Sequence, residues 1–237
     1  VSKQVFDEAL TYPKCLTVEN FLRFMIAPTC CYQLQFPLTN RIRIPRLIKH
    51  FLEFLGANLL MCYLFMQHVV PKCKESLVYF ETRNYFKIFV SVLGVGVPCS
   101  YIWLSIFFGL FHAWMNFWGE CTRFADRRFY SDWWNSGNLA EYWRKWNYPI
   151  HNWLVRHIYF PLVRRGVKSD IARLLTFTVS AIFHEYIIIG IFRVTNFIAF
   201  TLMIINIPLM AFQKAMKDKI SKDHNNILFW VAYCILG

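Results

Sequence analysis

Residues 173–193 read RLLTFTVSAIFHEYIIIGIFR, and this stretch decides the fold class. Arg173 and Arg193 bracket 19 residues in which Glu185 is the one Asp, Glu, Lys or Arg. A helix of about 20 apolar residues crosses the roughly 30 Å of hydrocarbon in a bilayer, so the stretch predicts a transmembrane helix. His184 follows Arg173 by 11 residues. At about 1.5 Å per residue, this spacing places His184 near the bilayer midplane.

An ionisable side chain at that depth is costly, and by default it indicates a functional site. Thr176, Ser180 and His184 follow one another at steps of four, so they form a polar stripe on one helix face that leads towards Arg173. The alternative is a His184 that is buried and bonded to a neighbouring helix, with Glu185 as its partner. The helix sequence alone leaves both interpretations open.

Three further stretches lack Asp, Glu, Lys and Arg: residues 54–70, 88–118 and 194–212, and a fourth such run begins at residue 225. Residues 88–118 would measure about 46 Å as one helix, which is too long for an untilted span. Gly94, Gly96 and Pro98 therefore predict a break, followed by a full span over residues 99–118.

The composition supports a membrane protein, because hydrophobic residues reach 57% and aromatic residues 19%, whereas charged residues are only 17%. Disorder, collagen and a small disulfide scaffold are excluded on this basis. We expect an all-α polytopic membrane protein with about four to five transmembrane helices. The first residue is Val1 and the last, Gly237, lies in an apolar run, so we expect one membrane-embedded domain over 1–237 that is incomplete at both ends, the C-terminal fragment of a longer protein.

Basic residues distribute unevenly between the two sides that these spans define. Lys and Arg number 21 in residues 1–53, 119–173 and 213–226, against 5 in residues 71–87 and at Arg193. The positive-inside rule predicts that the first set faces the cytoplasm. Residues 119–173 then form a long cytoplasmic segment, whose tryptophans and basic residues are typical of amphipathic helices at a membrane interface.

The sequence gives little support for a metal or nucleic-acid site. The eight cysteines form no CxxC pair, and position 188 is Ile, which rules out the HExxH motif after His184. His112 is expected to be a core or interhelical residue, and solvation explains His50, His68, His157 and His224 at segment ends. We therefore expect no metal. The net charge of +12 fits a membrane surface or an anionic ligand as well as nucleic acid, and nucleic acid is not expected.

Two unlinked motifs carry a specific resemblance. Residues 129–135 read FYSDWWN and residues 184–186 read HEY; both resemble signatures of the membrane-bound O-acyltransferase superfamily, in its acyl-CoA branch of diacylglycerol and sterol acyltransferases. Residues 143–166, WRKWNYPIHNWLVRHIYFPLVRRG, and residues 27–37, APTCCYQLQFP, resemble the type 1 diacylglycerol acyltransferases, whereas sterol acyltransferases lack the RRG and PxHxW text.

The resemblance implies a multi-pass enzyme of the endoplasmic reticulum membrane that transfers an acyl group from acyl-CoA to 1,2-diacylglycerol and makes triacylglycerol. Its expected partners are acyl-CoA, diacylglycerol and membrane lipids, with a homo-oligomer as a further expectation and no cofactor, since acyl-CoA is a substrate.

The resemblance also implies roles for single residues. His184 would be the general base. Glu185 would orient or tune it, unless it bonds a neighbouring helix. Asn147 would hold His184 or donate to the thioester carbonyl. The resemblance and the basic, aromatic character of 119–173 assign acyl-CoA binding to Phe129, Tyr130, Asp132, Trp133, Trp134, Asn135, His151 and Tyr159. Arg173, at the mouth of the His184 helix, is placed to meet CoA phosphates. Trp143 is a further acyl-CoA candidate, with anchoring at the membrane interface as its alternative.

Two other functions stay open at this point. A sterol or other lipid-alcohol O-acyltransferase would use the same chemistry on a different acceptor. A non-enzymatic membrane carrier with a midplane His–Glu pair is the second alternative, but it gives no reason for the FYSDWWN motif.

Overall fold

The computed structural model describes residues 12–13, 15–33, 36–216 and 221–236. Their regular structure is helical, with one isolated β-bridge between Leu38 and Phe124. Within this part of the chain, four helical segments are long and apolar enough to cross a membrane: Ile44–Glu81, Tyr85–Cys121, Ser169–Phe192 and Ile198–Met216. The prediction of an all-α polytopic membrane protein is confirmed. The apolar run after residue 225 lies in a further helix, α11 (Lys222–Leu236).

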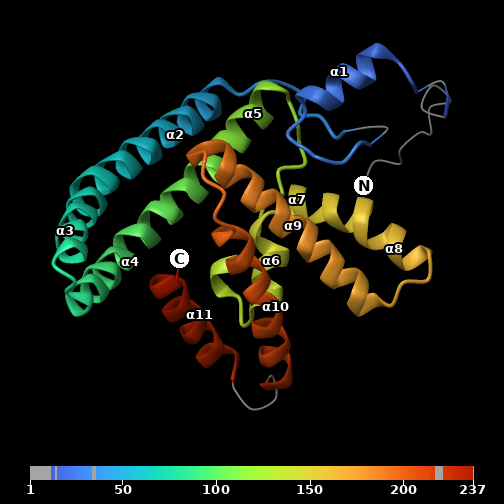
Figure 1. The fold of residues 1–237 in the computed structure, drawn as a ribbon. Coiled ribbons are helices and arrows are strands. Elements are labelled where there is room, and N and C mark those ends of the chain that lie inside the picture. Colours follow the sequence, from blue (N-terminus) through green and yellow to red (C-terminus); the bar gives the residue numbers. More distant parts are fainter. Residues whose placement is uncertain (1–11, 14, 34–35, 217–220, 237) are drawn as a thin grey trace. The chain divides into compact units, whose positions relative to one another are not determined.

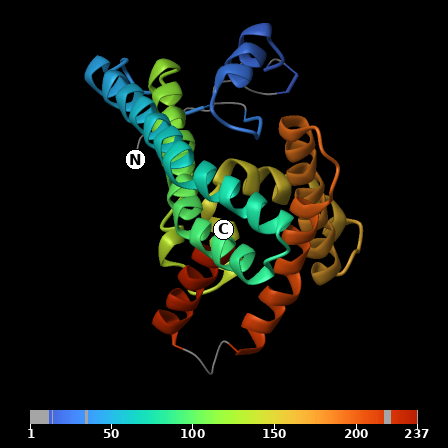
Figure 2. The same cartoon turned by 60° about the vertical axis from the view of Figure 1, so that its left-hand side comes forward.

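The chain divides into two compact units, Val1–Phe129 with Val231–Gly237, and Tyr130–Trp230. In the first unit, a short helix, α1 (Val18–Ile26), precedes a long helical hairpin. One arm consists of α2 (Ile44–Leu64), the π-helical turn η2 (Phe65–Val69) and α3 (Val70–Glu81). The other arm consists of α4 (Tyr85–Phe107), the π-helical segment η3 (Phe108–Trp114) and α5 (Met115–Cys121). The two arms lie side by side in Figures 1 and 2.

An ion-pair cluster joins the two arms at the end opposite to the hairpin turn. Glu120 on α5 is fully buried, and its carboxylate pairs with the guanidinium groups of Arg43 at 2.8 Å and Arg127 at 2.7 Å. The backbone N–H of Arg43, just before α2, donates to the same carboxylate at 2.7 Å. Two cations and a backbone donor therefore compensate the buried charge, as a buried carboxylate requires.

The predicted break at Gly94, Gly96 and Pro98 is wrong, because α4 continues through all three residues. Pro98 removes one backbone hydrogen bond. Transmembrane helices tolerate that loss where neighbouring bonds persist. The irregularity in this arm lies instead at η3, where the helix widens to π geometry.

The first span is also longer than the uncharged run 54–70 indicates. The helix extends through Pro71 and the charged residues that follow, and the connection to α4 begins only at Thr82. Lys72 and Glu75 form an ion pair at 3.1 Å, and the Tyr79 hydroxyl donates to Glu75 at 2.6 Å. Such i, i+3 and i, i+4 pairs support a helix after the apolar run has ended.

The second unit begins with the short 3₁₀ turn η4 (Trp133–Asn135) and α6 (Leu139–Trp146). A continuous helical stretch follows, made of α7 (Tyr148–Leu154), η5 (Val155–Tyr159) and α8 (Phe160–Arg164). The helices α9 (Ser169–Phe192) and α10 (Ile198–Met216) then form a second hairpin, visible in Figure 1. Arg193 ends α9 in a left-handed conformation at φ 54°. Helices are thus present in residues 119–173, and their position at the membrane interface stays a prediction.

The long helices expose much of their apolar surface. In α9, Ile182 and Ile187 are each 55% exposed, and in α4 the exposed side chains include Val92 and Tyr101. Large exposed apolar faces are unusual in soluble monomers. They fit helices that hydrocarbon surrounds, in which all backbone hydrogen bonds are made within the helix.

Candidate active site

His184 lies in the second half of α9 with an exposed side chain. Its Nδ1 atom is 2.7 Å from the backbone carbonyl oxygen of Ser180, one turn earlier. A carbonyl oxygen only accepts hydrogen bonds, so Nδ1 carries the proton in this contact. In the neutral imidazole the lone pair is then on Nε2, and this nitrogen is the one that can accept a proton from a substrate.

Trp143 of α6 lies against His184. The ring centres are 6.4 Å apart and the ring planes meet at 88°, and the same indole meets Phe177 edge-on at 5.7 Å. The Trp143 Nε1 atom is buried and makes no hydrogen bond to another described residue. The structure therefore brings one predicted acyl-CoA residue next to the predicted base.

Glu185 contacts a neighbouring helix. It is 5% exposed, and its carboxylate accepts hydrogen bonds from the backbone N–H groups of Phe197 at 2.9 Å and Phe200 at 3.1 Å. These donors are among the first N–H groups of α10, which have no partner within their own helix. Of the two expectations for Glu185, the structure shows the bond to a neighbouring helix, and the role in tuning His184 stays a prediction.

Asn147 separates α6 from α7. Its side-chain oxygen accepts from the backbone N–H of Ile150 at 3.1 Å, which makes it the N-cap of α7. An asparagine in extended conformation before a proline in the first helical turn is typical of a helix start. No contact between the described Asn147 and His184 side chains is present, so its predicted role in the reaction stays a prediction.

His151 lies in the same helix as a half-buried residue. Burial lowers the pKa of its imidazole, and the positive charge of Arg144 lowers it further. Desolvation and a like charge both disfavour the imidazolium. At neutral pH His151 is therefore a hydrogen-bonding group rather than a cation, and its predicted acyl-CoA contact stays a prediction.

An ion pair fixes the FYSDWWN segment to α6. The Asp132 carboxylate is 2.8 Å from Lys145 Nζ, which also contacts Glu141 at 2.9 Å. The backbone N–H of Ser131 donates to the Lys145 carbonyl at 3.0 Å. The hydrogen bond from Lys145 lowers the pKa of Asp132, and a second bond from Ser131 adds to this effect. Asp132 thus holds the segment in place.

Trp133 is the centre of an aromatic cluster. It is 1% exposed. The centre of its indole lies 5.8 Å from the ring centre of Tyr142, 5.7 Å from that of Trp146 and 6.0 Å from that of Trp230. Trp134 is 46% exposed, and its carbonyl accepts from the Asn226 amide at 2.9 Å and the Trp230 indole at 3.0 Å. The two adjacent tryptophans therefore differ: Trp133 packs in the core of the unit, whereas Trp134 is exposed.

The remaining residues of the motif occupy different surroundings. Phe129 is 2% exposed, the Tyr130 ring lies 6.3 Å from that of Trp134, and Asn135 is exposed. The acyl-CoA contacts predicted for Phe129, Tyr130, Asp132, Trp133, Trp134 and Asn135 stay predictions.

Two predicted CoA residues meet near the start of α9. The Tyr159 hydroxyl is 2.9 Å from Ser169 Oγ, and this hydrogen bond lowers the pKa of Tyr159, with a further contribution from Arg173. The Arg173 guanidinium also contacts Asp170 at 3.1 Å and is 63% exposed. A hydroxyl and an exposed guanidinium at one place form a suitable contact for phosphate oxygens.

The predicted polar stripe is only partly available to a ligand. The Thr176 hydroxyl donates to the Ala172 carbonyl at 2.7 Å. It is therefore bonded within its own helix, as Thr side chains in helices often are. Thr176, Ser180 and His184 all lie in α9 at steps of four. Their use as a path for a substrate stays a prediction.

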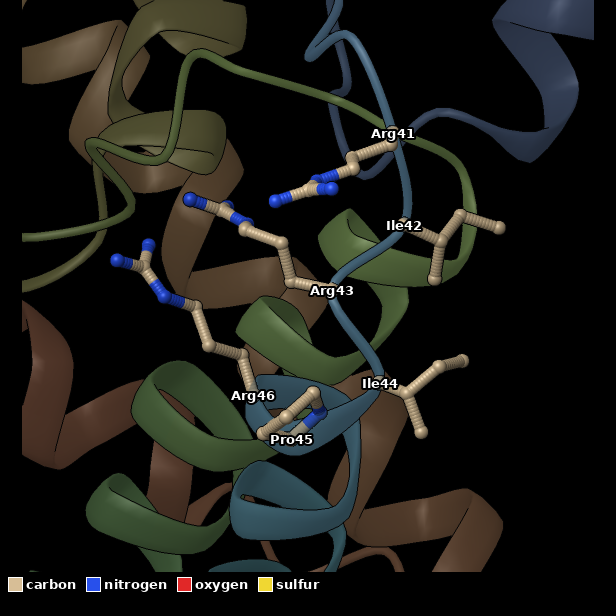
Figure 3. A pocket seen from close by; sticks show the side chains of 6 residues that line it. All are labelled: Arg41, Ile42, Arg43, Ile44, Pro45 and Arg46. Atoms are coloured by element: carbon tan, nitrogen blue, oxygen red, sulfur yellow. The ribbon is translucent and has the colours of Figure 1, made fainter.

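The first unit has a basic pocket at the start of α2. It has a volume of about 410 Å³ and is lined by Arg41, Ile42, Arg43, Ile44, Pro45 and Arg46. Figure 3 shows the side chains of Arg41, Arg43 and Arg46 directed to the same side. Arg43 is paired with Glu120, and a cluster of arginines at the beginning of a transmembrane helix is typical of its cytoplasmic end.

Two residues that hydrogen-bond to predicted acyl-CoA-binding residues, Lys145 and Ser169, are absent from the set of site residues predicted from the sequence. Lys145 follows Glu141 by four residues, so their helical pair could be predicted, but its contact with Asp132 depends on the path of the loop between them. Ser169 carries no signal in the sequence, since its contact with Tyr159 follows from the turn between α8 and α9.

Comparison with known proteins agrees with these features. The model of the membrane-bound O-acyltransferase family matches residues 4–237. The chain is 40% identical over 211 residues to a human protein named diacylglycerol O-acyltransferase 1, and the match covers 89% of this chain and 43% of that protein. It is 37% identical over 227 residues to the protein of the same name from Corylus americana, covering 95% of this chain and 42% of that protein. A rice protein, diacylglycerol O-acyltransferase 1-2, is 38% identical over 222 residues, covering 93% and 46%.

The chain thus spans less than half of the length of these curated relatives. The family match extends over nearly all of its residues, and the spans, the FYSDWWN segment and the His184 helix lie within it. This chain belongs to the membrane-bound O-acyltransferase family.

Proposed function

We propose that the protein is an acyl-CoA-dependent diacylglycerol O-acyltransferase. The reaction moves a fatty acyl group from the thioester of acyl-CoA to the free hydroxyl of 1,2-diacylglycerol, and it yields triacylglycerol and CoA. The observation that carries the proposal is the hydrogen bond of His184 Nδ1 to the Ser180 carbonyl. The names of the curated relatives support the acceptor.

In the first step His184 acts as general base. Nε2 accepts the proton of the acceptor hydroxyl while its oxygen attacks the thioester carbonyl carbon, and such proton transfer typically contributes about 10²–10⁴-fold to a rate. The tetrahedral intermediate carries a negative charge on the former carbonyl oxygen. The buried N–H of Trp143 and the Asn147 amide are candidate donors to it, because a preorganised donor stabilises such an oxyanion.

In the second step the intermediate collapses. The C–S bond breaks, the ester of triacylglycerol forms, and the CoA thiolate takes the proton from the His184 imidazolium. No covalent acyl-enzyme is needed, since the hydroxyl attacks the thioester directly. The neutral imidazole is then restored.

The substrates arrive from different phases. CoA carries phosphates and is soluble, so it would bind from the cytosolic side, where Arg173 and Tyr159 offer phosphate contacts. Diacylglycerol is a membrane lipid and would reach His184 laterally from the bilayer. The endoplasmic reticulum membrane is the proposed location, as the resemblance of the FYSDWWN and HEY motifs implies.

The test uses membranes that contain the full-length protein and radiolabelled acyl-CoA. One sample receives 1,2-diacylglycerol, a second receives cholesterol, and a third receives neither acceptor. Labelled triacylglycerol and free CoA in the first sample alone are expected. Labelled sterol ester in the second sample alone would show that the acceptor is a sterol rather than diacylglycerol. CoA release that is absent, or that does not depend on an acceptor, would contradict an acyltransferase and favour the non-enzymatic carrier.

A further inference from the structure

Three side chains that form metal-ligand sets elsewhere meet between the two arms of the first hairpin. His50 and Glu53 lie one turn apart on α2, and His112 lies in η3. His50 Nδ1 is 2.8 Å from Glu53 Oε2, and His112 Nε2 is 3.9 Å from the same oxygen. One potential ligand atom from each residue lies within 4.8 Å of the others.

His50 and Glu53 lie near the start of the first long apolar helical segment, Ile44–Glu81, and His112 lies in the second, Tyr85–Cys121. All three side chains are partly buried. The side chains of His50, Glu53 and His112 are 12%, 22% and 30% exposed. Solvation therefore does not explain His50, contrary to the sequence-based expectation. Two imidazoles and one carboxylate from two separate helical segments thus offer three potential metal ligands at one partly buried place.

The local structure holds the three residues in this arrangement. The i, i+3 spacing puts His50 and Glu53 on one face of α2. Lys49 Nζ lies 3.7 Å from the other carboxylate oxygen of Glu53, and such an outer contact orients a ligating carboxylate. His112 stacks on Phe108 at 4.9 Å, within π-helical geometry, which occurs frequently at functional sites.

We propose that His50, Glu53 and His112 bind a Zn²⁺ ion that joins the two arms of the hairpin. Zinc takes imidazole nitrogen and carboxylate oxygen ligands at about 2.0–2.2 Å. Tetrahedral ligands at that distance are about 3.3 Å apart, so the observed separations require small side-chain adjustments. Two imidazoles and one carboxylate are also a ligand set of known zinc sites.

Three protein ligands leave one coordination position for water or another oxygen ligand. The ion would neutralise Glu53 and fix the register of α2 against η3. The expected absence of a metal rested on histidine spacing near cysteines, and a site whose ligands come from separate helices shows no such spacing.

The first experiment measures zinc in the purified full-length protein. The protein is stripped with a chelator, and ZnCl₂ is added in the presence of a competing zinc dye. We expect the wild type to bind one equivalent of zinc. Glu53→Gln and His112→Gln should each abolish this binding or lower the zinc affinity by more than the roughly 10–100-fold that loss of an outer-shell residue causes. His68→Gln is the matched control, because His68 lies in another π-helical turn, η2, outside the cluster.

X-ray absorption on the zinc-loaded wild type gives a readout that needs no variant. Two imidazole nitrogens and an oxygen ligand at about 2.0–2.2 Å are expected. Failure of the wild type to retain zinc against the dye would overturn the proposal, as would retention by both Glu53→Gln and His112→Gln. If the variants do not fold, an absorption spectrum without two imidazole ligands overturns it. In these cases the three residues form a metal-free hydrogen-bonded cluster. Zinc content is measured without acyl transfer, so this result is independent of the proposed enzyme activity.

Discussion

The indole of Trp143 meets the imidazole of His184 edge to face, with ring centres 6.4 Å apart and ring planes at 88°. An aromatic pair of this kind is worth about 0.5–1.5 kcal/mol beyond its buried area. The contact connects α6, which follows the FYSDWWN segment, to the helix that carries the proposed base. It therefore gives α6 a means of setting the orientation of the His184 ring.

Trp143→Ala should lower kcat of acyl transfer by about two- to tenfold, since the loss of roughly 0.5–1.4 kcal/mol corresponds to that range. Trp143→Phe keeps the ring contact but lacks the indole N–H. If Phe restores the wild-type kcat, the packing role is sufficient. A kcat of Trp143→Phe as low as that of Trp143→Ala would instead indicate the N–H as a donor in the reaction.

His184→Ala should reduce acyl transfer by at least the roughly 10²–10⁴-fold that a general base contributes. Protein abundance should stay near wild type, because the side chain is exposed and its described hydrogen bond is within its own helix. Labelled triacylglycerol is measured per amount of immunodetected protein, with His68→Ala as the control. Activity of His184→Ala within threefold of wild type would reject the assignment.

Glu185→Ala should destabilise the protein, because it removes both acceptors from the first N–H groups of α10. Both hydrogen bonds are partly buried, and a donor left without a partner costs up to about 1–3 kcal/mol. The thermal midpoint in detergent should fall for Glu185→Ala and fall less for Glu185→Gln, which keeps one acceptor oxygen. An unchanged midpoint combined with lost activity would contradict a capping role and favour direct participation in the chemistry.

Arg173→Ala should raise the apparent KM for acyl-CoA more than the KM for diacylglycerol. The guanidinium would contact the CoA phosphates, which are remote from the reacting atoms of one substrate only. Its loss therefore weakens the binding of acyl-CoA equally in the ground state and the transition state, which raises KM for that substrate. Arg164→Ala is a matched control on α8, where attraction to lipid headgroups is the simpler role. Equal changes in both KM values for Arg173→Ala would point to a structural arginine at the membrane surface.

Asp132 should make the protein sensitive to acid. Lys145 holds the pKa of this carboxyl below its usual value, so its contribution to stability is present above the unfolded pKa of about 3.9. That contribution is lost as pH falls through the lowered pKa. The thermal midpoint of wild type should therefore drop between pH 5 and pH 2 by more than that of Asp132→Asn. An equal drop in both proteins would show that the pair does not stabilise the fold.

The sequence predicted those features that depend on local pattern. Uncharged runs located the spans, and the position of His184 between two arginines placed it deep in α9. The capping role of Asn147 could also have been predicted from the Asn-Tyr-Pro order that begins α7. These properties are set by residues within one or two helical turns.

Features that depend on packing between segments could not be predicted in this way. Glu185 meets the N–H groups of Phe197 and Phe200 only because the turn after Arg193 returns the chain. His50 and His112 are far apart in sequence, and the register of two helical arms brings their rings to 5.8 Å. The break expected at Pro98 failed because one missing hydrogen bond costs less than interrupting a long apolar helix.

The carbonyl of Trp134 accepts hydrogen bonds from Asn226 and Trp230 of α11, more than 90 residues further along the chain. The backbone conformation of the FYSDWWN segment thus depends on α11, a helix that cannot be inferred from the motif itself. A premature stop codon just before residue 226 would remove both donors and leave the FYSDWWN and HEY motifs intact. Such an allele would keep the motifs by which the family is recognised, yet its FYSDWWN segment would lack both of these hydrogen bonds.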